Sequence, residues 1–311
     1  MYVKHKKRFG QNFISDVNFL RSLVNLAGIS KADNVLEIGA GAGALTRELA
    51  AAARFVAAYE IDRDLEPILT AALKGAENVR LVLADALKAD NAEIAALFRK
   101  GNAQCTMHNA QLKDKPQVSD REQSDKNPDN TSLFSLLTSQ FPDFQFKLVA
   151  NLPYYITTPL IFKFLDAPTC AEMAVMVQKE VAERLAAKEG TAAYGALTVA
   201  VGVAADVKIL KRVPRKIFYP VPDVDSAFVS IKRNAEKFAV SDRAVLSRLI
   251  GSAFAMRRKT LANNLMRGFS LPREQAETLL KAAGLPLNVR GEALSPARFV
   301  ALGNAIADFI E

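Results

Sequence analysis

Three side chains in the stretch Asn151-Leu152-Pro153-Tyr154 suit recognition of a planar amine. Asn151 offers an acceptor oxygen and a donor nitrogen. Pro153 has a fixed φ and no N–H, and the ring of Tyr154 gives a face on which a base can stack. The apolar run 147–150 before them is typical of a buried strand. We interpret the stretch as a clamp for an exocyclic amine, although a lone motif of this type is more often an ordinary turn.

A glycine-rich turn, 39–44, lies between a predicted apolar strand and a predicted Ala-rich helix. Its spacing fits both a dinucleotide-binding turn and the turn of S-adenosylmethionine (AdoMet) methyltransferases. Glu37 favours the second, because a carboxylate would repel a pyrophosphate, whereas AdoMet carries an ammonium and a sulfonium. A purely structural turn is the third alternative.

Two further carboxylates follow predicted strands. Glu60 is placed to bind ribose hydroxyls, and Asp85 to accept a hydrogen bond from a purine amino group. In open parallel sheets, ligands bind at the carboxyl ends of the strands. These residues are therefore predicted to meet the glycine turn at one edge of a sheet.

The apolar periodicity predicts an α/β fold with a terminal pair of strands, followed by a small all-α C-terminal domain. The predicted strands are 34–39, 54–61, 79–84, 147–150, 173–178, 207–213 and 226–232. The predicted helices are 15–27 (N-cap Ser15), 45–53, 91–99, 158–165, 179–187, 197–205, 242–256, 258–267, 273–283 and 296–310.

The domain boundary is predicted near residue 236, giving a methyltransferase domain over 1–236 and a helical domain over 237–311. The connection before Asn151 is far longer than a crossover requires. Few aliphatic residues occur over 108–131. We therefore predict an exposed, mobile insertion near 100–143.

The chain of 311 residues has a net charge of +8, which favours a polyanionic partner, nucleic acid above a membrane surface. Its cations cluster in three places: Lys4, Lys6, Lys7 and Arg8; Lys208, Lys211, Arg212, Arg215 and Lys216; and Arg257, Arg258 and Lys259. The spacing of cysteines and histidines predicts no metal site. Without a membrane-length apolar run or a secretory signal, we expect a cytoplasmic protein.

Aromatic residues accompany cations in the proline-containing loop 213–223. Phe218 and Tyr219 beside Arg215 and Lys216 suit stacking on bases with phosphates alongside. A buried aromatic plug is the alternative interpretation, more so for Tyr219 than for Phe218.

Five sequence motifs resemble those of a known family and occur in the same order along the chain. They are 7–13 (KRFGQNF), 37–46 (EIGAGAGALT), Glu60 with Asp85, 151–154 (NLPY), and 213–222 with its Phe-x-Pro-x-Pro ending. The chain resembles the ribosomal RNA adenine N6,N6-dimethyltransferases of the bacterial small-subunit (16S) type. The resemblance covers nearly the whole chain apart from the insertion. It implies a Rossmann-like sheet of the class I AdoMet-dependent methyltransferase type, mostly parallel with an antiparallel last strand and with helices on both faces. It departs at Ile14, Ala40, Ala42 and Tyr155, where the family commonly has other residues.

The resemblance implies roles for individual residues. The cofactor AdoMet would contact Asn12, Ile14, Glu37, Gly39, Gly41, Glu60, Ile61, Asp85, Ala86 and Asn151. Catalysis would involve Asn151, Leu152, Pro153, Tyr154 and Phe218, with Tyr154 and Phe218 stacking on the target adenine.

The implied activity is transfer of two methyl groups to N6 of each of two adjacent adenosines near the 3′ end of 16S rRNA in the small ribosomal subunit. A role in subunit biogenesis and a monomeric state are expected. The Asn151 oxygen and the Leu152 or Pro153 carbonyl would accept the two N6–H bonds. Alternatives are an rRNA-binding assembly factor without activity, a 23S rRNA adenine N6-methyltransferase of the resistance type, and an NAD-dependent oxidoreductase.

Overall fold

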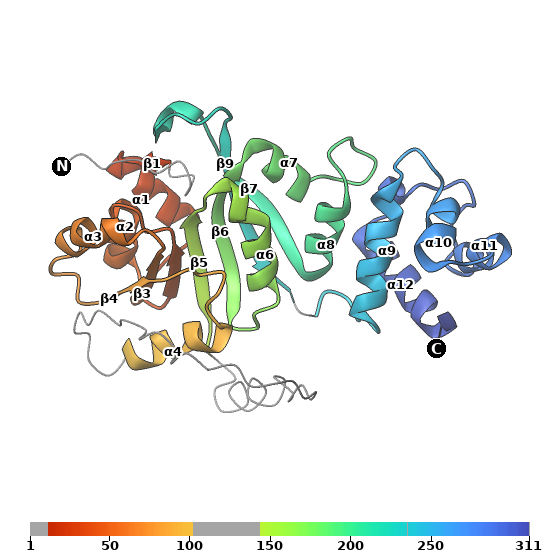
Figure 1. Cartoon of the computed structure of the whole chain (residues 1–311), viewed down its shortest axis with the longest axis horizontal. Helices are drawn as coiled ribbons and strands as arrows, with labels where there is room; N and C mark the ends of the chain where they lie inside the picture. Colours follow the sequence, from red (N-terminus) through yellow and green to blue (C-terminus); the bar gives the residue numbers. More distant parts are fainter. Residues whose placement is uncertain (1–11, 102–143, 235, 311) are drawn as a thin grey trace, which may run out of the picture. The chain divides into compact units, whose positions relative to one another are not determined.

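The computed structural model describes residues 12–101, 144–234 and 236–310. Lys4, Lys6, Lys7, Arg8 and nearly all of the predicted insertion lie outside the described residues. The strands are β1 Phe13–Ile14, β2 Asn34–Ile38, β3 Phe55–Glu60, β4 Val79–Leu83, β5 Phe146–Asn151, β6 Cys170–Gln178, β7 Ala205–Val213, β8 Phe218–Tyr219 and β9 Ser226–Arg233. The helices are α1 Val17–Leu26, α2 Ala44–Ala52, α3 Glu66–Ala72, α4 Asn91–Gly101, α6 Thr157–Leu165, α7 Lys179–Leu185, α8 Ala196–Ala204, α9 Arg243–Ala255, α10 Leu261–Phe269, α11 Arg273–Ala282 and α12 Pro296–Ile310 (Figure 1).

Seven strands hydrogen-bond in the order β4-β3-β2-β5-β6-β9-β7. The strand β2 pairs in parallel with β3 and β5, β3 pairs in parallel with β4, and β7 pairs antiparallel with β9. This confirms the predicted mostly parallel sheet with an antiparallel last strand. A separate two-stranded sheet, β1 with β8, was not predicted.

The chain divides into two compact units. The first contains the described residues up to Val175 together with Lys216–Pro222, and the second contains Met176–Arg215 and the residues from Asp223 onward. This division groups α7, α8, β7 and β9 with the C-terminal helices, and so differs from the predicted boundary near residue 236.

Burial in the first unit explains why its central strands are mostly apolar. Every residue of β3 is buried, and β2 is buried after its first residue. A strand covered on both faces is expected to have this near-continuous apolar pattern. The N-cap of the first helix, α1, lies one residue later than predicted, because the Asp16 side chain, and not that of Ser15, accepts a hydrogen bond from the Phe19 amide.

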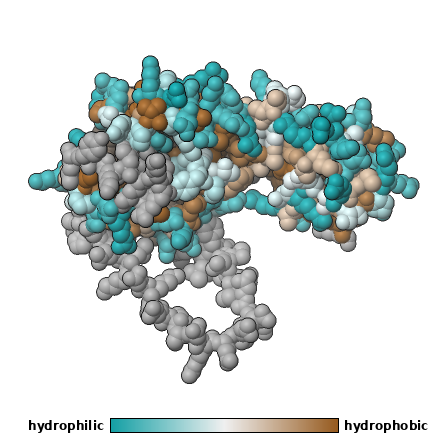
Figure 2. Space-filling view, turned by 45° about the horizontal axis from the view of Figure 1, so that its top comes forward, coloured by the Kyte–Doolittle hydropathy of each residue, from teal (hydrophilic) through white to brown (hydrophobic). Residues whose placement is uncertain are grey.

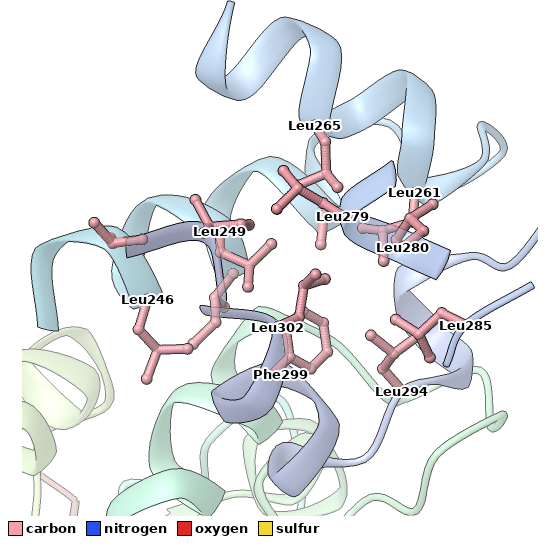
Figure 3. Packing of buried hydrophobic residues seen from close by; sticks show 14 of the residues in the cluster. Leu246, Leu249, Leu261, Leu265, Leu279, Leu280, Leu285, Leu294, Phe299 and Leu302 are labelled. Atoms are coloured by element: carbon pink, nitrogen blue, oxygen red, sulfur yellow. The ribbon is translucent and has the colours of Figure 1, made fainter. Parts of the chain in front are cut away.

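A leucine-rich cluster forms the core of the second unit. In Figure 3, residues of this cluster lie close together, among them Leu249 and Phe299. Tyr194 and Val199, which precede the predicted boundary, belong to the same cluster. The Tyr194 hydroxyl also donates to the Leu294 carbonyl at 2.6 Å. The C-terminal helices therefore share their core with the segment that contains α8.

Figure 2 shows one face of the molecule, on which hydrophilic residues predominate and hydrophobic residues form smaller groups. In the described part of the chain, no helix combines the length and the apolar character that crossing a bilayer requires.

Candidate active site

A cavity of about 170 Å³ lies at the carboxyl ends of β2, β3, β4 and β5. It is the edge where ligands are expected in a parallel sheet. The structure brings eight of the predicted cofactor-binding residues to its wall: Asn12, Gly39, Gly41, Glu60, Ile61, Asp85, Ala86 and Asn151. Leu152, Pro153 and Tyr154 line the same cavity.

A second cavity, of about 440 Å³, is lined by Ile14, Glu37 and Tyr219 among others. Both cavities share four wall residues: Phe13, Gly39, Gly41 and Asn151. The glycine turn and Asn151 therefore contribute to both spaces.

The glycine turn needs glycine at Gly41 for two reasons. Its φ of +59° is in the left-handed region, which side chains other than glycine rarely adopt. A Cβ at this position would also lie 2.8 Å from the ring carbon Cε1 of Phe13. The absence of a side chain here leaves room for the Phe13 ring, which packs against the turn.

Glu60 is fixed by backbone donors. Its Oε2 accepts from the Gly41 amide at 2.7 Å, and its Oε1 accepts from the Asp62 amide at 2.8 Å. Burial raises the pKa of Glu60, and these hydrogen bonds partly offset the rise. Each carboxylate oxygen has a second lone pair, so the group can still accept from a diol.

Asp85 follows β4 and closes a tight turn, in which its Oδ1 accepts from the Leu87 amide at 3.0 Å. This hydrogen bond fixes the orientation of the carboxylate. Because Asp85 lines the smaller cavity, the structure places it where the sequence predicts a partner for a purine amino group.

Asn151 has a defined amide orientation. Its Nδ2 donates to the Asn12 carbonyl at 2.8 Å, which directs the acceptor Oδ1 to the other side of the amide. The bond also connects the end of β5 to the segment just before β1.

The carbonyls after Asn151 are not equivalent. The Pro153 carbonyl accepts from the Ile156 amide at 3.1 Å and from the Thr157 hydroxyl at 3.3 Å. A carbonyl oxygen has two lone pairs, so these bonds use its capacity. Of the two carbonyls considered from the sequence, that of Leu152 is therefore the better acceptor for a ligand.

Glu37 is fully buried, and burial raises its pKa to about 8. The nearby Thr46 hydroxyl acts against this rise, and the charge of Glu60 adds to it. Neither Glu37 oxygen meets hydrogen-bond geometry with any described residue, Thr46 included. A buried carboxylate that lies beside the larger cavity and lacks such a bond is suited to bind a cationic group of a ligand.

Phe218 does not contribute to either cavity wall, and only 2 % of its surface is exposed. The reason is the pairing of β8 with β1, which sets Ile14 opposite Phe218 and Phe13 opposite Tyr219. Neighbouring side chains on a strand point to opposite faces. The predicted open face on Phe218 is thus not present, and Tyr219, which is 58 % exposed, lines the larger cavity instead.

The predicted RNA-binding cations differ in their surroundings. The Arg257 guanidinium donates to the carbonyls of Ala192 (3.1 Å) and Tyr194 (3.2 Å), and lies 3.5 Å from the Glu292 carboxylate. Arg258 and Lys259 are exposed. The sequence signal, three consecutive cations, did not distinguish the structural Arg257 from its neighbours.

Arg215 and Lys216 are also exposed. The Arg215 amide donates to the Asp225 carboxylate at 2.9 Å. Among the described residues, no His, Cys, Asp and Glu side chains gather in a group that could hold a metal ion.

The strand order with its antiparallel terminal pair, together with the glycine turn and the acidic residues at the strand ends, is that of a class I AdoMet-dependent methyltransferase. The sequence model of one family, described as ribosomal RNA adenine dimethylase, matches residues 2–308. The chain belongs to this ribosomal RNA adenine dimethylase family.

Named relatives agree with this assignment. "Ribosomal RNA small subunit methyltransferase A" of Geobacillus thermodenitrificans is 42 % identical over 309 residues, which are 97 % of this chain and 90 % of the relative. The protein of the same name from Listeria innocua is 39 % identical over 312 residues, or 98 % and 92 % of the two chains.

Two solved structures are similar over most of their length. The 23S rRNA methyltransferase ErmE has a TM-score of 0.64 and 25 % identity, covering 95 % of this chain and 100 % of that one. A dimethyladenosine transferase from Plasmodium falciparum has a TM-score of 0.68 at 23 % identity, covering 93 % and 95 %, and supports the fold.

Proposed function

We propose that this methyltransferase dimethylates N6 of two adjacent adenosines near the 3′ end of 16S rRNA in the small ribosomal subunit. The products are N6,N6-dimethyladenosines and S-adenosylhomocysteine. The names of the relatives at about 40 % identity support this target. We further propose that the protein acts as a cytoplasmic monomer without a metal ion and takes part in subunit biogenesis.

One observation carries the proposed chemistry: the orientation of the Asn151 amide at the wall that both cavities share. With Nδ2 bound to the Asn12 carbonyl, Oδ1 accepts one N6–H of the target adenine, and the Leu152 carbonyl accepts the other. These acceptors favour a pyramidal nitrogen whose lone pair is localised. Catalysis then consists of positioning and electrostatics without a strong base.

The residues present fit AdoMet. The glycine turn and the Glu37 oxygens suit the methionine part with its ammonium, Glu60 suits the ribose, and Asp85 suits the adenine amine. Asn12 and Ile14 cover the site beside Gly39, and Ile61 and Ala86 line the wall of the smaller cavity where the adenine ring of AdoMet would lie next to Asp85. When bound, AdoMet supplies an electrophilic methyl group on its sulfonium.

The target base must leave its stack to reach these acceptors, which favours an adenosine in a single-stranded segment. Tyr154 offers it a stacking face, and Tyr219 takes the place first assigned to Phe218. A second transfer to the same nitrogen proceeds with one N6–H bond fewer.

The test is incubation with labelled AdoMet and small subunits from a strain that lacks the modification, followed by mapping of the modified nucleotides. We expect label on two adjacent adenosines near the 3′ end of 16S rRNA. Label on 23S rRNA supplied in parallel, and none on small subunits, would assign the resistance-type activity. Absence of AdoMet binding by titration calorimetry would assign a non-enzymatic assembly factor.

A further inference from the structure

Lys163, in the last turn of α6, has contacts that the proposed chemistry does not use. Its ammonium donates to the Leu87 carbonyl at 3.0 Å and to the Ala89 carbonyl. The helix begins at Thr157, whose hydroxyl binds the Pro153 carbonyl. One short helix thus joins the Asn151–Tyr154 stretch to the segment after β4.

The segment 84–90 after β4 is a loop whose first half lines the smaller cavity through Ala84, Asp85, Ala86 and Leu87. Its internal bonds centre on Asp85, whose carbonyl accepts from the amides of Lys88 (3.1 Å) and Ala89 (3.2 Å). Two carbonyls of the loop are directed at Lys163. A loop of this kind keeps a fixed shape only if its polar backbone groups are satisfied.

The charges around Lys163 fit this bridging position. Burial lowers the pKa of the ammonium, while the carboxylates of Asp90, Asp85 and Glu93 act in the opposite direction. The cation therefore lies near two carboxylates of the segment that it binds, Asp85 and Asp90, and near Glu93 of α4. Hydrogen bonds from a charged donor are stronger than neutral ones, more so where water is partly excluded.

We infer that Lys163 is a positioning residue for the cofactor: from α6 it holds the loop that presents Asp85, Ala86 and Leu87 to the cavity. The inference rests on the proposed placement of the AdoMet adenine at Asp85. It adds a residue that does not line either cavity and acts only through the loop carbonyls that it binds.

The test compares three variants. Lys163→Met removes the donors and the charge but keeps most of the side-chain volume, and Lys163→Arg restores a cationic donor. Lys147→Met is the matched control, because Lys147 also donates to a carbonyl, that of Gly28 at 2.9 Å, and pairs with Asp33 at 3.1 Å, but lines neither cavity.

The binding of S-adenosylhomocysteine by titration calorimetry is the first measurement. We expect Lys163→Met to raise Kd about tenfold, the loss of roughly one charged hydrogen bond. Lys163→Arg should recover most of the affinity, and Lys147→Met should stay within about twofold of the wild type. In turnover assays the KM for AdoMet should rise for Lys163→Met, while kcat at saturating AdoMet is retained.

Hydrogen exchange without ligand is the second measurement. Lys163→Met should speed exchange of the amides in 84–90, and Lys147→Met should not. Unchanged exchange there, or equal changes in Kd for the two Met variants, would overturn the inference. If the wild type binds no S-adenosylhomocysteine, the proposed function fails, and the exchange experiment still decides the role of Lys163.

Discussion

The two polar atoms of the Asn151 amide have different roles. Nδ2 donates to the Asn12 carbonyl, and Oδ1 faces the other way, where it is the proposed acceptor for the adenine amine. Replacing Asn151 by Ala removes the proposed acceptor for the adenine amine. We expect kcat to fall by about a hundredfold or more, as when one oriented polar group is removed from an active site. The measurement is single-turnover methyl transfer, paired with calorimetry of S-adenosylhomocysteine, which should still bind.

Asn78→Ala is the control for this substitution, since the Asn78 amide also donates to carbonyls, those of Ala50 (2.9 Å) and Ala53 (3.2 Å), and lines neither cavity. It should reduce stability and leave the transfer rate nearly unchanged. Normal turnover by Asn151→Ala would show that the clamp mechanism is wrong.

Glu37 gives a prediction about pH, because burial raises its pKa from 4.5 to about 8. Between these two values the folded protein holds a proton that the unfolded chain has lost. The contribution of Glu37 to stability is therefore complete below pH 4.5 and is lost as pH rises to about 8.

The variant Glu37→Gln cannot ionise, so it should gain stability relative to the wild type as pH rises through this range. The difference in unfolding free energy should grow by at most about 1.4 kcal/mol per pH unit. Urea unfolding at pH 5, 7 and 9, without cofactor, measures it. A difference that does not change with pH would mean that Glu37 is ionised throughout.

At the scale of elements, the pairing of β1 with β8 decides which aromatic residue faces the cavity. Tyr219→Ala should weaken binding of the rRNA substrate with little effect on cofactor affinity, and Tyr219→Phe should retain most of the stacking. Phe218→Ala removes a buried ring and should instead destabilise the fold by about 3–5 kcal/mol. Substrate binding and urea unfolding, measured on all three variants, separate the two positions. A loss of substrate affinity in Phe218→Ala without loss of stability would return the stacking role to Phe218.

The three consecutive cations after α9 are expected to have different roles. Arg257→Ala removes hydrogen bonds to the carbonyls of Ala192 and Tyr194 and should cost about 1–3 kcal/mol of stability. The double variant Arg258→Ala/Lys259→Ala should keep its stability and weaken RNA binding. The slope of log K against log[salt] should fall by about 1.5 if both cations contact phosphates. An unchanged slope would identify Arg258 and Lys259 as ordinary surface charges.

Patterns of apolar residues were sufficient to predict the strands of the seven-stranded sheet and most of the helices, because burial alone imposes those patterns. Only Leu69 of the seven residues of α3 is buried, so these patterns did not predict that helix. They were not sufficient for β1 and β8, since two-residue strands that are distant in sequence have no periodicity of their own. The burial of Phe218 could not be predicted for this reason. The residues of the candidate site followed from the rule that parallel strands end at one edge. The saturated Pro153 carbonyl and the bridge from Lys163 depend on hydrogen bonds that sequence spacing does not specify.

For the whole molecule, the core of the second unit predicts the result of a truncation at the boundary that the sequence suggested. A chain that ends at residue 236 loses the partners of Tyr194 and Val199, including the Leu294 carbonyl. We expect this truncated protein to aggregate or to melt at a lower temperature than the full chain. Thermal unfolding and light scattering check this. A soluble truncated form with the Tm of the full chain would show that 1–236 is an independent domain.

The sheet of β1 and β8 also has a consequence for the order of events in catalysis. Phe13 belongs to the wall of both cavities and pairs with Tyr219, so we expect the two segments to open together. While a bound nucleotide holds Tyr219, spent cofactor cannot be exchanged past Phe13 and Ile14. The enzyme is therefore expected to release rRNA between transfers and to act distributively. Monomethylated adenosine should then accumulate early in a time course, and a large excess of unmodified subunits added during the reaction should capture the enzyme before dimethylation is complete.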